Sequence, residues 1–321
     1  MGSAVPPWWR RRLPPGSVGR IVRWDGWGRV GRGVAGVAAV AVAVAAVAGV
    51  WFTGQSLLAT RDQYRLSEQG QVTERFSHAI DNLGSDKLDV RVGGIYLLER
   101  LSAGSPADHA TVVDIVSAFV RTHSPVSVCP AAGTVIDAHN PDNRLPTDVQ
   151  AALTVIARRD ITGEDGRQID LLRTCLAGAR LNDAKLANVN ISGGDVRGAQ
   201  FSGADMEVAA LVNIEAAGAE LDNANLSGAL FTHASLTDTN FSHADLSHAV
   251  LQRANLARAN LGNANLSGAF LDGVNMAGAS LADADLSGTK LDTVTLDGIF
   301  YTPKTVWPKG FTPPPSRASF R

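Results

Sequence analysis

Residues 244–268 read ADLSH-AVLQR-ANLAR-ANLGN-ANLSG, five pentapeptides in succession. The frame continues in both directions, because every fifth residue from Leu171 to Leu296 is large and apolar, with Ala216 as the exception. Neither the 3.6-residue period of a helix nor the 2.0-residue period of a strand repeats at five. The spacing predicts a squared coil in which each pentapeptide forms one side, the large residue fills the interior and polar residues face outward.

Residues 224–228 (ANLSG) and 284–288 (ADLSG) match A-[D/N]-L-x-x, and in this pattern the chain resembles the pentapeptide-repeat family. The resemblance implies an all-β right-handed quadrilateral β-helix, a pentapeptide-repeat solenoid, over residues 168–300. About six coils at the ~4.8 Å strand spacing would form a rod about 30 Å long. Residues 301–321 would form a C-terminal cap and a disordered tail, in which Tyr301, Trp307 and Phe311 either cover the last coil or bind a ligand.

The N-terminal part of the chain has the pattern of a membrane anchor. Residues 1–32 form a basic Pro/Gly-rich segment, and the twenty residues 33–52 carry no charge. At ~1.5 Å per residue this run is long enough for the ~30 Å hydrocarbon core, so it predicts a transmembrane helix. A cleaved signal peptide and a buried helix are the alternatives. The positive-inside rule places the N-terminus in the cytoplasm and the C-terminal domain outside.

Residues 53–162 predict a small all-α segment of about four helices, because their apolar residues recur at helical spacing. Thr147 and Gln150 form a capping-box pattern at the start of the last helix. Residues 69–76 and 88–96 resemble the segment before the repeats in bacterial, membrane-anchored pentapeptide-repeat proteins. That second resemblance implies no activity.

Residues twenty positions apart should stack on one face of the rod. One such column contains Asp205, Asn225, Asp245, Asn265 and Asp285. These side chains would either form hydrogen-bonded turns or present an acidic stripe to a partner. Another column has apolar residues where the family pattern has Asp or Asn: Ala210, Leu230, Val250 and Phe270, with Val212 nearby. This candidate interface patch would be covered by the chain itself, by a second copy in a homodimer or by a protein partner, or would stay exposed.

Cys129 and Cys175 would form one disulfide outside the cytoplasm, and two free thiols are the alternative. The histidines are too widely spaced to suggest a metal site, since His233, His243 and His248 would lie on different faces of the coil. We predict no catalytic residue, metal or cofactor, because the sequence contains no nucleophile with a base and no paired carboxylates.

These features favour a non-enzymatic, membrane-anchored scaffold, which contacts lipid through residues 33–52 and presents a rigid rod to an unidentified protein. The family resemblance supplies an alternative, since some soluble members mimic DNA and bind DNA gyrase. Residues 171–300 contain seven basic and fourteen acidic residues, a net charge of −7 that five Arg interrupt. Mimicry needs a more coherent field, and no binding to nucleic acid is expected. An enzyme is the least favoured reading.

Overall fold

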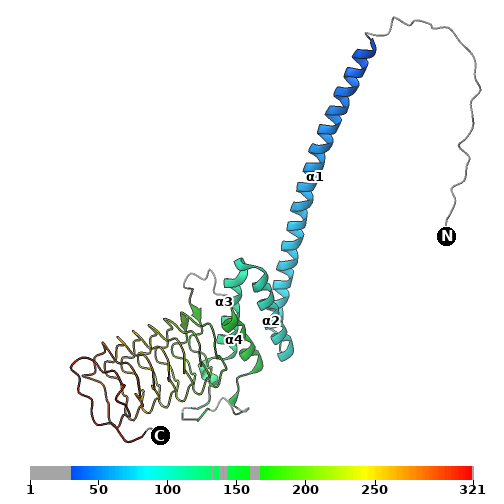
Figure 1. The fold of residues 1–321 in the computed structure, drawn as a ribbon. Coiled ribbons are helices and arrows are strands. Elements are labelled where there is room, and N and C mark those ends of the chain that lie inside the picture. Colours follow the sequence, from blue (N-terminus) through cyan, green and yellow to red (C-terminus); the bar gives the residue numbers. More distant parts are fainter. Residues whose placement is uncertain (1–29, 132, 137–139, 141–142, 160–166, 320–321) are drawn as a thin grey trace, which may run out of the picture. The chain divides into compact units, whose positions relative to one another are not determined.

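The computed structural model describes residues 30–131, 133–136, 140, 143–159 and 167–319 (Figure 1). Its contacts divide the chain into two compact units, Met1–Gln69 and Gly70–Arg321. Helix α1 (Val30–Leu83) passes through the boundary between them. The helical segment and the repeats, which the sequence separated near residue 165, therefore belong to one unit.

Helix α1 contains the uncharged run of residues 33–52. The side chains described for this run, from Ala41 to Phe52, are all exposed, and they include four valines, Trp51 and Phe52. Judged on the residues whose placement is described, no helix is long and apolar enough to cross a membrane.

Three further helices follow: α2 (Leu88–Gly104), α3 (Pro106–His123) and α4 (Thr147–Arg158), with a short 3-10 helix, η1 (Val126–Val128), after α3. The three α-helices pack on one another around fully buried apolar side chains such as Ile95, Val116 and Leu153. The helical period of the sequence thus predicted these elements correctly. The capping-box prediction was wrong, because α4 begins at Thr147 itself and no side chain caps it.

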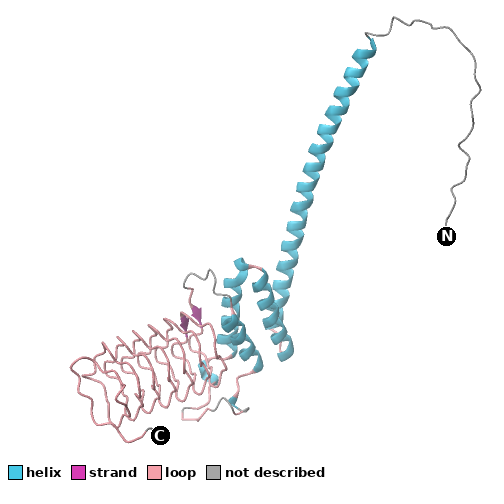
Figure 2. Ribbon diagram, viewed as in Figure 1, coloured by secondary structure: helices cyan, strands magenta, loops and turns pink. Residues whose placement is uncertain are grey.

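The repeats form a β-helix whose coils contain twenty residues. Strands β1 (Ile169–Asp170) and β2 (Val189–Asn190) pair in parallel, and later coils are joined by single parallel bridges such as Asp205 to Asn225. Figure 2 draws most of the rod as loop because each side of a coil contributes only one bridging pair. This register confirms the predicted coil of four pentapeptides. The large apolar residues are buried inside it, with Leu226, Leu246 and Leu266 completely inaccessible.

Both ends of the rod are covered. At the N-terminal end, α4 shares one hydrophobic core with the first coils, and the Lys185 N–H donates to the carbonyl oxygen of Ala157 at 3.0 Å. At the C-terminal end, Tyr301, Trp307 and Phe311 pack against the same core, as expected of a cap. The following tail was expected to be disordered. It instead bonds back to the rod, where the Arg317 N–H donates to the Ile299 carbonyl oxygen at 3.0 Å.

The corners of the coils need a left-handed backbone. The residue two positions after each interior residue has φ between 55° and 72° at most turns, and it is usually Gly, Asn, Asp or His. Such residues adopt this conformation at low cost. Val208 is different, because it is β-branched, has φ of 55° and is 53% exposed. Its backbone is strained, and its half-exposed side chain gains little stabilisation from burial.

Replacing Val208 by Asn should therefore stabilise the protein. Asn tolerates the left-handed region, so we expect Val208→Asn to raise the free energy of unfolding by about 1 kcal/mol. The matched reverse change is Asn213→Val, at a corner with the same φ of 55°. It should lower the free energy of unfolding by a similar amount in urea denaturation. Two changes of equal sign would contradict the assignment of strain to the corner.

Candidate functional site: an apolar column and a clasped segment

Ala210, Leu230, Val250 and Phe270 form one column on the rod, here called the apolar column. Parallel bridges join each member to the next, so their side chains project from successive coils of one face. Leu230 is 37% exposed and Phe270 is 53% exposed, while Val250 and Val212 are half-buried. The described part of the chain thus leaves the column accessible to another molecule.

The equivalent positions on the other faces are polar, and their side chains bond to one another. The amide of Asn225 donates to Asp205 Oδ1 at 3.0 Å, and Asn265 donates to Asp245 at the same distance. Asp245 Oδ1 also accepts the backbone N–H of Ser247 at 2.9 Å. Of the two interpretations of the Asp and Asn column, these contacts support hydrogen-bonded turns.

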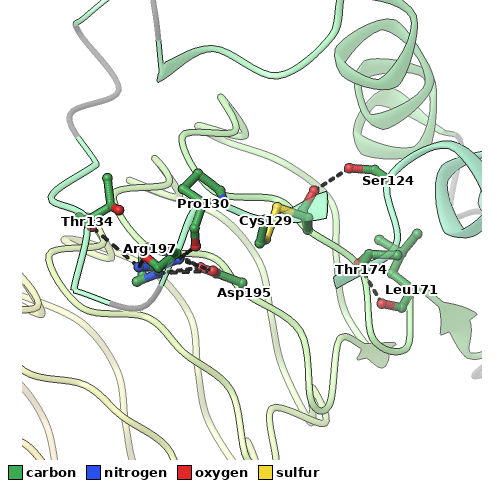
Figure 3. Close-up of a disulfide and its surroundings, with 10 residues drawn as sticks. Ser124, Cys129, Pro130, Thr134, Leu171, Thr174, Asp195 and Arg197 are labelled. Atoms are coloured by element: carbon green, nitrogen blue, oxygen red, sulfur yellow. Dashed lines mark hydrogen bonds and ion pairs between the residues drawn. A yellow bond between two sulfur atoms is a disulfide. The ribbon is translucent and has the colours of Figure 1, made fainter. Parts of the chain in front are cut away.

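Cys129 and Cys175 form a disulfide that joins the segment after α3 to the first coil, with their Cα atoms 5.4 Å apart (Figure 3). Next to it, the Cys175 N–H donates to the Ser124 carbonyl oxygen at 2.7 Å, and Ser124 Oγ donates to the Cys175 carbonyl oxygen at 2.6 Å. The structure therefore brings together the two cysteines that the sequence left undecided.

A buried ion pair holds the same segment a second time. Arg197 and Asp195 are 8% and 4% exposed, and Arg197 Nη2 lies 2.6 Å from Asp195 Oδ2. The guanidinium also donates to the carbonyl oxygens of Pro130 at 2.7 Å and Ala131 at 3.1 Å (Figure 3). The hydrogen bond to Asp195 raises the pKa of Arg197 above its ordinary value, although burial acts in the opposite direction.

The described residues between α3 and α4, here called the clasped segment, lie directly on the rod. Two glycines of the rod make this close approach possible. Gly178 and Gly198 are corner residues with φ of 70° and 61°. A Cβ atom on Gly178 would clash with the carbonyl oxygen of Asn143, and one on Gly198 would clash with that of Ile136. Any side chain at either corner would push the segment away from the first coils.

The sequence offered one signal for this clasp. Between residues 171 and 296, Arg197 is the single Arg that directly follows a large apolar residue of the frame. In the sequence alone, Arg197 is one of five Arg that interrupt the acidic charge of the repeats. The carbonyl oxygens that it binds, those of Pro130 and Ala131, lie more than sixty residues away in the chain, so periodicity alone could not reveal them.

The comparison with known families agrees with this geometry. A family sequence model described as "Pentapeptide repeat region" matches residues 224–301, and one described as "Pentapeptide repeats (8 copies)" matches residues 170–207. The chain belongs to the pentapeptide-repeat family. No protein of curated function matches this pentapeptide-repeat protein.

Several solved structures are similar to this pentapeptide-repeat protein. Rfr23 from the cyanobacterium Cyanothece 51142 is 40% identical over 30% of this chain, with a TM-score of 0.20, and the match spans 63% of Rfr23. The protein alr5209 from Nostoc Pcc 7120 is 31% identical over 29% of this chain and 77% of its own, with a TM-score of 0.29. QnrB1, a plasmid-mediated fluoroquinolone resistance protein, is 19% identical over 43% of this chain and 85% of its own, with a TM-score of 0.20.

The histidines of the repeat occupy corners of the pentapeptide-repeat coil. His233, His243 and His248 all have φ near 60°, a conformation in which His is enriched. Among the residues that the structure describes, no group of His, Cys, Asp or Glu could hold a metal ion.

Removing the buried guanidinium should destabilise this pentapeptide-repeat protein. Arg197→Ala leaves the Asp195 carboxylate buried without its partner, so we expect the free energy of unfolding in urea to fall by about 3 kcal/mol. The double variant Asp195→Ala, Arg197→Ala should regain more than half of this loss, because no buried charge is left unpaired.

The matched control is Arg258→Ala, which removes an exposed pair with Asp238 at 2.5 Å. An exposed ion pair contributes little, so this change should cost less than about 1 kcal/mol. Equal losses in Arg197→Ala and Arg258→Ala would contradict the clasp.

Proposed function

We propose that this pentapeptide-repeat protein is a non-enzymatic scaffold that binds another protein through the apolar column. One observation carries the proposal: the column replaces hydrogen-bonding Asp and Asn by apolar side chains, of which Leu230 and Phe270 stay exposed. The side chains of Leu230 and Phe270 cannot accept a backbone N–H, as the Asp245 carboxylate does from Ser247. They also remain exposed after folding. Folding alone does not favour this exchange, whereas binding a protein that covers the column does.

Val208 is a second observation in favour of a binding surface at this face of the rod. It stands two residues before Ala210, and its strained left-handed backbone carries an exposed apolar side chain. An observed backbone outlier of this kind is a recognised indication of function. Val208 and half-buried Val212 flank Ala210 in the sequence and add two apolar side chains to the same coil.

The DNA-mimic alternative has less support on this rod. Some carboxylates of the rod are paired with arginines, as in Asp195 with Arg197 and Asp238 with Arg258. Such ion pairs interrupt the coherent acidic field that mimicry needs.

Aspartates in the apolar column test the proposal, and a matched control variant accounts for their effect on the fold. The triple change Leu230→Asp, Val250→Asp, Phe270→Asp introduces the residue type that the repeat tolerates at this position. We expect it to abolish capture of the protein partner. The measurement is photo-crosslinking in the cells that produce the protein, from a photoreactive residue at Val212.

The control places the same three charges on another face, by Ser235→Asp, Asn255→Asp and Asn275→Asp. These residues also form one column, so fold and net charge match the test variant. Crosslinking that survives in the apolar-column variant, or that is lost equally in both variants, would refute the proposed interface. Size-exclusion chromatography with light scattering shows whether the captured protein is a second copy.

We further propose that residues 33–52 anchor the protein in a membrane, with the N-terminus in the cytoplasm and the repeats outside. The proposal rests on the uncharged run, on the Arg-rich residues before it and on the disulfide. Disulfides persist in oxidising compartments, which agrees with repeats that lie outside the cytoplasm.

Charges inside the run should release the protein from the membrane. Each Arg near the centre of a span costs about 3 kcal/mol, so Val42→Arg, Val47→Arg should move the protein to the soluble fraction after a carbonate wash. Alkaline phosphatase fused after Arg321 should be active, because this enzyme folds only outside the cytoplasm. Wild-type protein in the carbonate supernatant would refute the anchor, and an inactive fusion that stays in the membrane would refute the orientation.

A further inference from the structure

A groove of about 880 Å³ lies between α2, α4 and the first coil, away from the apolar column. Its walls include Arg91, Tyr96 and Leu88 from α2, Arg158 from α4, Arg144 from the residues before α4 and Arg180 from the first coil. The volume is within the range of ligand sites in proteins. Four guanidinium groups from four segments thus line one depression.

The positive charge in the groove is largely unbalanced. Among the residues that the structure describes, Asp148 is the one acidic residue that lines the groove, and each of its carboxylate oxygens accepts a hydrogen bond. Asp148 Oδ2 accepts from Arg91 Nε at 2.7 Å, and Oδ1 accepts from the Val149 N–H at 3.0 Å. The guanidinium groups of Arg144, Arg158 and Arg180 are exposed and have no acidic partner among the residues that the structure describes.

Contacts across the groove hold its walls in place before anything binds. The Gln150 side-chain amide donates to the Arg180 carbonyl oxygen at 2.9 Å and accepts from the Arg180 N–H at 3.0 Å. This pair of bonds joins α4 to the first coil beside the groove. Arg91 is held by Asp148 and by the Ser85 carbonyl oxygen at 2.9 Å. A preformed site loses little conformational freedom on binding.

One wall of the groove is apolar. Leu88 and Tyr96 are 41% and 44% exposed, and half-buried Val92 lies between them in the sequence of α2. A ligand that fits must therefore offer carboxylates to the arginines and apolar side chains to α2. Guanidinium groups bind carboxylates in paired hydrogen bonds, which gives such a site its selectivity.

We propose that the groove binds an acidic peptide segment of a partner protein, one that alternates Asp or Glu with apolar residues. The net charge of −7 on residues 171–300 disfavours binding of such a segment along the rod, whereas the groove gathers four arginines. This site is separate from the apolar column, and either proposal can fail without the other.

The test uses full-length protein in a mild detergent and a fluorescein-labelled peptide, Gly-Glu-Leu-Glu-Gly-Leu-Glu-Glu-Gly, followed by fluorescence anisotropy. We expect binding that weakens as salt is raised and that falls about tenfold in Arg158→Gln, Arg180→Gln. Both side chains are exposed, so the fold should be retained, as a thermal melt will show. The control Arg253→Gln removes an exposed Arg from the rod and should leave binding unchanged.

Two further probes make the outcome decisive. A peptide with Gln in place of every Glu should not bind, and inorganic tripolyphosphate should not compete at the concentration of the peptide. Equal binding by wild type and Arg158→Gln, Arg180→Gln, or equal binding of the Gln peptide, would overturn the proposal. A groove that binds tripolyphosphate but does not bind the peptide would also overturn the proposal, since it would then be a site for small anions.

Discussion

The stacking of residues that lie twenty positions apart is the interaction on which the rest of the structure depends. The Leu226 N–H donates to the Asp245 carbonyl oxygen at 2.8 Å, and the same bond recurs coil after coil with the interior residues in line. One bridging pair per side is too little to hold a coil alone, so each coil is stable only against its neighbours. Stacking then determines the role of each periodic position. The interior residue is buried in the core, the side chain of the residue before it accepts a hydrogen bond in the turn, and the corner residue adopts a left-handed backbone.

A stack of this kind has two open ends, and the chain covers them in different ways. The first coil is covered by a helix, α4, whose buried face continues the core of the rod, and whose position is fixed by Gln150 and Arg180. The last coil is covered by aromatic side chains from the tail, which Arg317 ties back at Gly278 with a bond of 2.6 Å. Covering the first coil with α4 adds a surface whose residues do not follow the five-residue period. The disulfide and Arg197 hold that additional surface against the rod.

The sequence reveals the periodic parts of this structure and conceals the parts that do not follow the repeat. The period of five predicted the coil, the buried Leu positions and the columns, because each of these repeats a local rule. The clasp made by Arg197 and the groove arginines were missed, because the segments that they bring together are remote in the sequence and do not follow the period. The capping box failed for a similar reason, since the Gln150 amide is taken by the distant Arg180 backbone. The exposed column was found because a broken repeat is visible in the sequence.

Features that can bind another molecule are therefore expected where the period fails, because periodic side chains are already used by the stack. The apolar column breaks the rule for the residue before each Leu, and Val208 breaks the rule for the corner. The arginine groove lies where the repeats end against α4. The two surfaces differ in chemistry, since one presents apolar side chains and the other guanidinium groups, so the two proposed interactions would select different parts of a partner. A rigid rod keeps the distance between two such points fixed within the unit of Gly70–Arg321, which is what a scaffold requires.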